Sequence, residues 1–337
     1  MKVLVTGGVG LLGTYVCQHF RENGDEVVVY DNLTEYELQK TNYNITASRA
    51  HNLNFIKDLG CEFHKIDITR ELPYDKDIDY IVHCAAQPAM TIAIENPYLD
   101  ITTNILGTYY MLELARKLDI PIANCSSIHI YGNNINNFLE EKETRFTCDP
   151  PMIGEDAFIL QGDISPLHAS KRCAELYVQA FIETYGLRAT TFRLTGMYGP
   201  RQFGGMDHGW VANFAIRTVM ERPITIFDTG KQVRDILYAS DAARAFDLWY
   251  KHGEAGIYNI GGGMNNSISL TECLQYLSEI TGKKQDITVA PPRFGDLYYF
   301  VCDCTKAAHD FRWKPDVGNR AGLKSLVNWI TVNKNIL

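Results

Sequence analysis

A glycine-rich stretch near the N-terminus, Lys2 to Gly13 (KVLVTGGVGLLG), is the feature that most limits what this chain can fold into. It begins with the apolar run Val3 to Val5, which is typical of a parallel strand buried on both faces. Glycines follow at Gly7, Gly10 and Gly13, and the residues after them have the pattern of a helix. A strand that turns through glycines into a helix can hold a pyrophosphate, because the backbone approaches the anion and the helix N-terminus presents free N–H groups. The predicted contacts in this turn are Gly7, Gly10, Leu11 and Leu12.

An acidic residue follows this turn at the distance expected for a dinucleotide site. The next predicted strand, Glu26 to Tyr30, leads into Asp31 and Asn32. A carboxylate in this place accepts hydrogen bonds from the adenosine ribose and repels a 2′-phosphate. The sequence therefore predicts that NAD binds here, with Asp31 and Asn32 among its contacts.

Two later strand ends extend the predicted cofactor site. After the strand Cys61 to Ile66, Asp67 either reaches the adenine amino group or caps the following turn, and Ile68 lies beside it. After the strand Asp79 to Cys84, two small residues leave room for a flat cofactor ring in the crevice at the carboxyl ends of parallel strands. The predicted contacts there are Ala85, Ala86 and Gln87.

The order of the predicted elements indicates the fold class. Strands and helices alternate up to about Leu194, and mixed elements follow. This order predicts an α/β fold, with a Rossmann-type doubly wound parallel sheet and a smaller mixed α/β lobe at the C-terminus. The predicted NAD-binding domain is 1–194 with a return segment at about 231–252, and the predicted substrate lobe is 195–230 and 253–337.

Two long helices and one loop are predicted around the middle of the chain. Ser165-Pro166 begins a helix that runs to Tyr185, since a serine cap followed by proline is a favoured helix start. Another helix is predicted from Glu95 to Leu118. Between Asn133 and Gly162 no periodicity is visible, which indicates a loop over the site.

Composition excludes several classes of function. The chain has 337 residues and a net charge of −8, which argues against nucleic acid as a partner. Its nine cysteines are scattered without metal-ligand spacing, so we expect reduced thiols and no metal site. No signal peptide and no bilayer-spanning apolar run are apparent, so we expect a cytoplasmic protein with no membrane partner.

Taken in order, the motifs resemble those of the extended short-chain dehydrogenases/reductases, in the nucleotide-sugar epimerase/dehydratase branch. The matching motifs are TGGVGLLG, YDN at Asp31, DI at Asp67, HCAAQ at His83, NILGT at Asn104, SS…YG at Ser127, the helix of Lys171, MYGPRQ at Met197, QVRDILYASD at Arg234, YNIGG at Asn259 and RFGD at Arg293. Within that branch, MTIAIENP and MYGPRQFGGMDHGW are most similar to the CDP-paratose (CDP-tyvelose) 2-epimerases. The resemblance implies a permanently bound NAD that takes a hydride from a sugar carbon and returns it to the other face, or uses the ketone to acidify a neighbouring C–H. It also implies Asn104 and Lys171 as cofactor contacts.

The resemblance implies a nucleoside-diphosphate sugar as the substrate. Ser127 matches the hydroxyl residue that hydrogen-bonds the sugar, and three arginines match diphosphate or nucleotide contacts, where guanidinium groups bind phosphate oxygens in pairs. The predicted substrate-binding residues are Ser127, His129, Arg201, Gln202, Arg234 and Arg293. The helices Glu95 to Leu118 and Ser165 to Tyr185 resemble those of the family's four-helix dimer bundle, which implies a homodimer or homotetramer.

One position departs from the family pattern. The family has a tyrosine four residues before the lysine, where it removes the proton of the sugar hydroxyl. In this chain Lys171 is present, but the tyrosine position is Leu167. A leucine cannot carry a proton, so the usual base is absent.

Three alternatives follow from this departure. In the first, another group replaces the tyrosine: His129 stands where dehydratase relatives carry Glu and GDP-mannose 3,5-epimerases carry Cys, and histidine titrates near neutral pH. This alternative includes a 3- or 5-epimerase or another lyase-type reaction that uses His129. In the second, the reaction lacks a full redox cycle or the substrate supplies the base. In the third, the chain is a catalytically silent or slow paralogue that binds NAD and nucleotide sugar. The predicted catalytic residues are Ser127, His129 and Lys171, with His168, Tyr131 and Tyr198 as further candidates.

Overall fold

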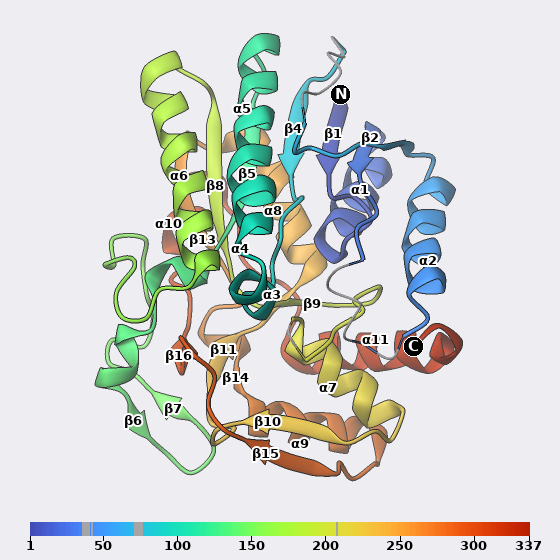
Figure 1. Ribbon diagram of the computed structural model, residues 1–337, viewed down its shortest axis with the longest axis vertical. Helices are drawn as coiled ribbons and strands as arrows, with labels where there is room; N and C mark the ends of the chain where they lie inside the picture. The colour runs from blue at the N-terminus through green and yellow to red at the C-terminus, as the bar shows by residue number, and fades with distance from the viewer. Residues whose placement is uncertain (36–40, 42, 71–76, 207) are drawn as a thin grey trace.

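The computed structural model describes residues 1–35, 41, 43–70, 77–206 and 208–337, and within them the predicted parallel sheet is present. Seven strands lie in the order β13-β8-β5-β4-β1-β2-β3, all parallel (Figure 1). Their bounds are β1 Lys2–Thr6, β2 Glu26–Asp31, β3 Glu62–Lys65, β4 Tyr80–His83, β5 Ile122–Ser127, β8 Ala189–Leu194 and β13 Gly256–Ile260. The strand order reverses direction between β1 and β4, which is where open α/β sheets bind their ligands.

Alternating side chains on the central strand explain why helices cover both faces of the sheet. On β1, Val3 and Val5 point into one buried cluster and Leu4 into another. The first cluster includes residues of α1 (Leu11–Glu22), α8 (Ala239–His252) and α10 (Thr305–Phe311). The second includes residues of α5 (Gly107–Leu118) and α6 (Pro166–Tyr185). The Rossmann-type doubly wound prediction is confirmed.

Local signals placed one long helix correctly and missed a change of winding in the other. Helix α6 begins at Pro166 after the Ser165 cap and ends at Tyr185, as predicted. The segment predicted as one helix from Glu95 divides into α4 (Pro97–Leu99), the π-helix η2 (Asp100–Leu106) and α5. In a π-helix the backbone hydrogen bonds join residues five apart instead of four, and such turns are often found at functional sites.

A second lobe packs against the carboxyl ends of the strands (Figure 1). Its core is formed mainly by three helices that bury apolar faces against one another and against two short sheets. The helices are α7 Trp210–Val219, α9 Leu270–Thr281 and α11 Asn319–Val332, and the strands are β10 Ile224–Phe227 with β15 Ile287–Ala290, and β14 Ser267–Ser269 with β11 Val233–Asp235 and β16 Tyr299–Phe300. A short parallel pair, β9 (Met197–Tyr198) and β12 (Leu237–Tyr238), joins the two lobes.

The strands assign residues to lobes differently from the predicted boundaries. Strand β13 pairs with β8 at the edge of the large sheet, although 253–337 was predicted as substrate lobe. Conversely, β11 pairs with β14 and β16 in the second lobe, although 231–252 was predicted to return to the first. Helix α8 does return, and packs beside α1 on the large sheet. The chain therefore crosses between lobes more often than the prediction allowed.

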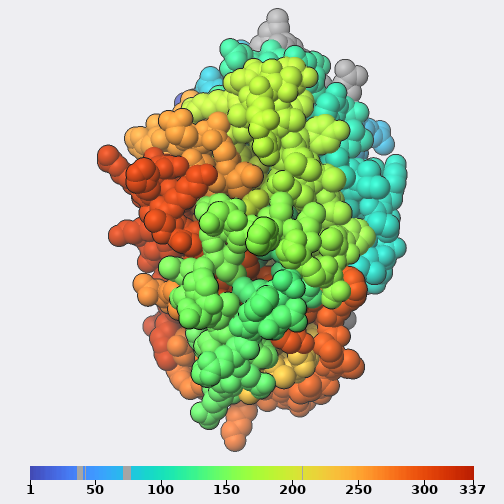
Figure 2. Space-filling view, turned by 90° about the vertical axis from the view of Figure 1, so that its left-hand side faces the viewer, coloured from blue at the N-terminus to red at the C-terminus, as the bar shows by residue number. Residues whose placement is uncertain are grey.

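The segment 133–164 lies over the side of the molecule, between α6 above and the second lobe below (Figure 2). It contains the 3₁₀ turn η4 (Asn134–Phe138) and the hairpin β6 (Glu140–Glu141) and β7 (Phe146–Thr147), so it is more structured than the predicted loop. The remaining elements are α2 Ile45–Asp58, α3 Met90–Glu95, η3 Ile128–Tyr131, η5 Met264–Asn266 and η6 Lys334–Ile336. Over the described residues, no helix combines the length and apolarity that crossing a membrane requires.

Candidate active site

One cavity of about 1220 Å³ lies between the carboxyl ends of the large sheet and the second lobe. Every predicted site residue lines it except Asn104 and the further catalytic candidates His168, Tyr131 and Tyr198. The residues are Gly7, Gly10, Leu11, Leu12, Asp31, Asn32, Asp67, Ile68, Ala85, Ala86, Gln87, Ser127, His129, Lys171, Arg201, Gln202, Arg234 and Arg293. Across the described part of the chain, no group of three or more His, Cys, Asp or Glu side chains is arranged to hold a metal ion.

The glycine turn has the close contacts that a pyrophosphate cradle requires. Gly7 has φ +66°, and a Cβ added there would lie 2.8 Å from the backbone of Ala85. A Cβ on Gly13 would lie 2.1 Å from the carbonyl oxygen of Gly7, so no residue larger than glycine fits at this position near the start of α1. The backbone at this turn is therefore bare, and it ends at a helix N-terminus that suits an anion. These residues fit a dinucleotide.

Asp31 fastens the turn as well as ending β2. Its Oδ2 accepts the Val9 N–H at 3.0 Å and its Oδ1 accepts the Leu33 N–H at 2.8 Å. A carboxylate has four lone-pair sites, so it can accept several hydrogen bonds at once. The prediction for Asp31 is compatible with this geometry, and the residue also shapes the turn.

Asn104 does not line the cavity but supports the loop that does. Its Oδ1 accepts the Gln87 N–H at 2.8 Å, and its Nδ2 donates to the Gln87 carbonyl at 3.1 Å. The buried Asp100 accepts from Gln87 Nε2 at 2.9 Å and from Ser170 Oγ at 3.0 Å. This network ties the π-helix and α6 to the loop after β4. Asn104 therefore positions the loop from behind instead of facing the space predicted for the cofactor.

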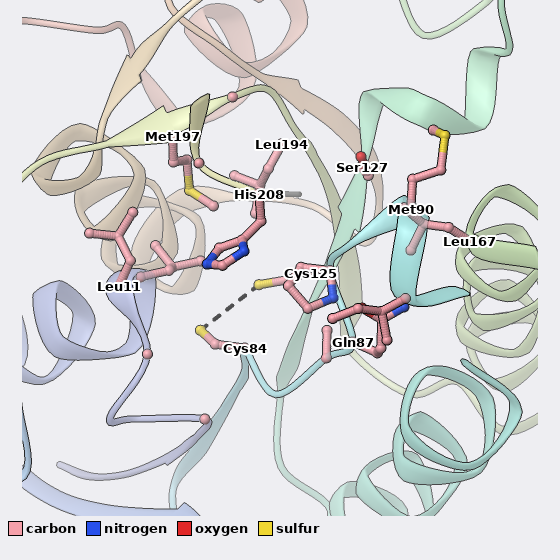
Figure 3. Close-up of a pocket in the computed structure, with 18 of the residues that line it drawn as sticks. Leu11, Cys84, Gln87, Met90, Cys125, Ser127, Leu167, Leu194, Met197 and His208 are labelled. Carbon is pink, nitrogen blue, oxygen red and sulfur yellow. Dashed lines mark hydrogen bonds between the residues drawn. The ribbon is translucent and has the colours of Figure 1, made fainter. Parts of the chain in front are cut away.

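Three groups line the cavity around the end of β5, two from the strand and one from α6. Ser127 Oγ caps the following turn by accepting the His129 N–H at 3.2 Å. Lys171, reaching in from α6, donates from Nζ to the carbonyl oxygen of Cys125 at 2.9 Å. The Cys125 thiol lies 3.9 Å from that of Cys84, because the two residues end neighbouring parallel strands (Figure 3). The structure thus brings the predicted catalytic residues together.

The environment of His129 makes it a neutral imidazole. Burial, with smaller contributions from Arg234 and His168, lowers the pKa of His129 to about 3. Its Nδ1 is buried without a hydrogen-bond partner among the described residues, and its ring meets that of His168 edge-on at 5.7 Å. His168 is in turn held by Ser165 through Nδ1. A group with so low a pKa is a poor base at neutral pH.

Leu167 forms an apolar wall beside these groups. It lies one helical turn before Lys171 on α6 and is almost completely buried. Met90, at the start of α3, lies beside Leu167 in the close-up, and both line the cavity together with Ser127 (Figure 3). Sequence reasoning missed Met90 as a cavity residue. A signal was available, since Met90 follows the Ala85-Ala86-Gln87 loop within one short turn.

The three predicted arginines have different surroundings. Arg234 lies 3.8 Å from Asp296 and donates to the carbonyl of Val233, next to its own position on β11. The Arg293 guanidinium lies 3.6 Å from the ring centre of Phe227 and donates to the Met206 carbonyl. Both come from the second lobe and line the cavity.

Arg201 instead packs against the first lobe. Its guanidinium lies between the rings of Tyr15 and Phe55, at 4.3 and 3.9 Å from their centres. It also donates to Thr14 Oγ1 at 3.3 Å and to Gln18 Oε1 at 3.0 Å. We predicted that Arg201 binds a diphosphate together with Arg234 and Arg293. In the structure, stacking and two hydrogen bonds hold its side chain on α1 instead.

Gln232 and Asp296, which the sequence prediction did not include, join the two remaining arginines. Gln232 Nε2 donates to the Phe227 carbonyl at 2.7 Å and to Asp296 Oδ2 at 3.4 Å. Both residues line the cavity. Gln232 lies inside the QVRDILYASD motif, so its position two residues before Arg234 was a usable signal.

Comparisons with known proteins agree with this site. The sequence model of the NAD dependent epimerase/dehydratase family matches residues 3–261. The CDP-paratose 2-epimerase of Salmonella typhi is 32% identical, over 98% of this chain and 99% of that protein. Crystal structures of the UDP-glucose 4-epimerases of Thermus thermophilus, in complex with NAD, and of Thermotoga maritima, with UDP-glucose, are each 29% identical over 98% of both chains, with TM-scores of 0.77 and 0.78. The bare glycine turn, the site at the end of β5 and the extent of these matches show that this chain belongs to the NAD dependent epimerase/dehydratase family.

Proposed function

We propose that this chain is an NAD-dependent epimerase of nucleoside-diphosphate sugars, of the type of the CDP-paratose 2-epimerases. One observation carries the proposal: a single cavity connects the glycine turn, the groups at the end of β5 and the arginines of the second lobe. A cofactor and a nucleotide sugar laid end to end have their parts in the same order: the pyrophosphate of the cofactor, the sugar, and the diphosphate of the substrate. The 32% identity to a CDP-paratose 2-epimerase supports the subfamily.

The proposed cofactor contacts are the bare backbone of the glycine turn, Asp31, and the loop after β4. When bound, NAD supplies the acceptor and donor of a hydride at a sugar carbon. The chain's own part is to hold the pyrophosphate at the N-terminus of α1 and to keep the loop at Ala85 fixed through Asn104 and Asp100. The crevice at the switch point of the sheet also keeps water away from the reacting carbon.

The proposed substrate lies between Ser127 and the second lobe. Ser127 hydrogen-bonds a sugar hydroxyl, and Arg234 with Arg293 bind the diphosphate and nucleotide. Both guanidinium groups are held by neighbours in the second lobe, so they are preorganised for an anion. The Leu167 and Met90 side chains place an apolar surface against the sugar ring, which suits a ring face that lacks hydroxyl groups.

Leu167 also favours a second candidate function, a silent paralogue that binds NAD and nucleotide sugar without turnover. The experiment that separates the two is incubation of the purified protein with CDP- and UDP-hexoses in heavy water, followed by NMR of the sugars. A new stereoisomer without deuterium supports the proposed epimerase, and deuterium at a ring carbon supports a 3- or 5-epimerase. Tight sugar binding with no change in any sugar supports the silent paralogue.

A matched pair of variants sharpens this test. Leu167→Tyr restores the phenol of the family pattern, and Leu167→Phe adds the same ring without the hydroxyl. If the site lacks only the phenol, the activity of Leu167→Tyr should rise by about 100-fold or more, which is the usual contribution of an acid–base group. The activity of Leu167→Phe should not rise. If a different group already serves the wild type, the tyrosine variant gains little.

The location and assembly of the protein are part of the same proposal. We propose a cytoplasmic enzyme, supported by its soluble family and its reduced cysteines, of which none forms a disulfide among the described residues. We also propose a homodimer or homotetramer, supported by apolar side chains exposed on α6.

A further inference from the structure

Three cavity groups near the end of β5 are candidates for the proton acceptor that Leu167 does not supply: His129, Ser127 and Lys171. His129 is the nearest histidine to the end of β5, but burial and the charge of Arg234 keep it neutral at any pH near 7. Ser127 is an alcohol whose Oγ already accepts the His129 N–H. Neither is a base of useful strength. Lys171 also reaches this end of the strand, and its Nζ is a titratable nitrogen.

Lys171 is held without a counter-ion. Its side chain is about nine-tenths buried, and Nζ has one hydrogen-bond acceptor among the described residues, the carbonyl of Cys125 at 2.9 Å. Within the same described residues no carboxylate lies within ion-pair distance of Nζ. A buried ammonium that lacks a partner is costly, and the amine is the cheaper form.

The charged and titratable groups that face Lys171 do not change this conclusion. Asp100 on η2 is occupied by Gln87, Asn104 and Ser170. Glu175, one turn along α6, is paired with Arg193 and Arg172. Lys171 also has Cys84, Cys125 and the neutral imidazole of His83 as neighbours, and His83 is fixed between Thr6 and Thr108. Burial is the largest influence, and it lowers the pKa of Lys171.

Leu167 and Lys171 lie on the same face of α6, since they are one turn apart. A leucine ends short of the place that a phenol oxygen would reach, and it offers no hydrogen bond to Nζ. The amine is thereby left open toward the sugar hydroxyl that Ser127 holds, because Nζ and Ser127 approach the same end of β5.

We propose that the ε-amine of Lys171, in its neutral form, accepts the proton of the reacting sugar hydroxyl in place of the missing phenol, directly or through one water. This inference rests on the proposed function, because it assigns a role in that reaction. The O–H bond breaks and its electron pair forms the carbonyl, while the hydrogen on carbon leaves as hydride to the bound NAD and the amine becomes an ammonium. Return of the hydride to the other face of the carbonyl carbon takes the proton back from the ammonium, so atoms and charges balance.

The first test reads the proton directly and needs no turnover. The NAD-loaded protein is labelled with [ε-¹³C]lysine, and the Lys171 signal is assigned by its loss in Lys171→Arg. The expected result is a titration midpoint below that of Lys324, which is exposed on α11. A midpoint equal to or above that of Lys324 overturns the proposal.

The second test separates a base from a mere positive charge. With CDP-glucose and UDP-glucose as probes, Lys171→Ala and Lys171→Arg are each expected to lose about 100-fold or more in turnover, because arginine keeps the charge but cannot release its proton. Added ethylamine is expected to rescue Lys171→Ala, and guanidinium ion is not. Rescue by both cations, or full activity of Lys171→Arg with NAD affinity retained, contradicts the proposal. If the wild type turns over no nucleotide sugar, the proposed function fails, whereas the NMR midpoint still decides the state of the amine.

Discussion

At the scale of single residues, burial changes the chemistry that the residue type suggests. His129 was predicted as a proton-transfer group because free histidine titrates near neutral pH. In the structure its ring is enclosed beside Arg234 and His168, and its pKa falls to about 3. The residue type indicated acid–base chemistry, and its neighbours leave a neutral hydrogen-bonding group.

A consequence for stability can be measured on His129. Between about pH 3 and 6.5 the unfolded chain binds a proton at this residue and the folded chain does not. The stability that depends on a neutral His129 is therefore fully present above pH 6.5, and it is lost as the pH falls toward 3. His129→Gln removes this linkage. From pH 7.5 to 5 the free energy of unfolding of the variant should fall by ~2 kcal/mol less than that of the wild type, at ~1.4 kcal/mol per pH unit below 6.5. Urea titrations of both proteins at each pH check this, and a variant that loses as much stability as the wild type would contradict it.

Arg201 gives a prediction that separates a structural guanidinium from a ligand-binding one. Because Arg201 stacks between Tyr15 and Phe55, Arg201→Met should lower the free energy of unfolding by about 1–3 kcal/mol. Its affinity for UDP and CDP, measured by calorimetry, should stay within about twofold of wild type. Arg234→Met, which removes a proposed phosphate partner, should weaken both nucleotides about tenfold or more. Equal losses of affinity in the two variants would return Arg201 to the substrate site.

At the scale of elements, the glycine turn between β1 and α1 is the most constrained junction. Gly13→Ala would place a methyl group 2.1 Å from the Gly7 carbonyl, so α1 must move away from the strand. We expect NAD affinity, measured by fluorescence titration, to fall at least about tenfold, together with a lower melting temperature. Gly318→Ala, where a Cβ meets nothing within 4 Å, is the matched control. It should leave NAD affinity unchanged, and an unchanged affinity in Gly13→Ala as well would mean that this turn is not the cofactor cradle.

Elements with local signals could be predicted from the sequence, and elements defined by distant partners could not. The Ser165-Pro166 cap fixed the start of α6, and the glycine turn located β1 and α1. Strand β13 was recognised as a strand, but its place beside β8 depends on pairing across more than sixty positions in the chain, which leaves no local trace. The π-winding of η2 was also missed, and the buried Asp100 of this helix bonds to Ser170, far along the chain, as well as to Gln87.

The candidate site follows the same division. Backbone requirements, such as the bare glycines and the small residues at Ala85, were readable because only certain residue types satisfy them. The partners of polar side chains could not be predicted in this way, because an asparagine or arginine can hydrogen-bond a ligand or a loop equally well. Asn104 supports the loop and Arg201 stacks on α1, whereas Arg234 lines the cavity as predicted.

At the scale of the whole molecule, the exposed apolar face of α5 and α6 argues for self-association. Leu176 and Tyr177 on α6 are 48% and 46% exposed, and the Tyr177 ring contacts that of Tyr109 on α5. Tyr185 extends the patch to the end of α6, which lies open along the upper part of the side view (Figure 2). A contiguous apolar patch on two helices is the kind of surface that a second copy covers.

We therefore predict that charge on this face dissociates the assembly. The wild type should have at least twice the chain mass of 38.1 kDa in light scattering after size exclusion, and Leu176→Glu with Tyr177→Glu should halve the oligomer, because a buried unpaired carboxylate is costly at an interface. Val332→Glu, on the distant α11, is the control and should keep the wild-type mass. NAD affinity should be the same in all three proteins, since the patch lies outside the cavity lining. A monomeric wild type, or a double variant that keeps the wild-type mass, would show that this face is not the interface, whereas a fall from four chains to two would make it one of two interfaces in a tetramer.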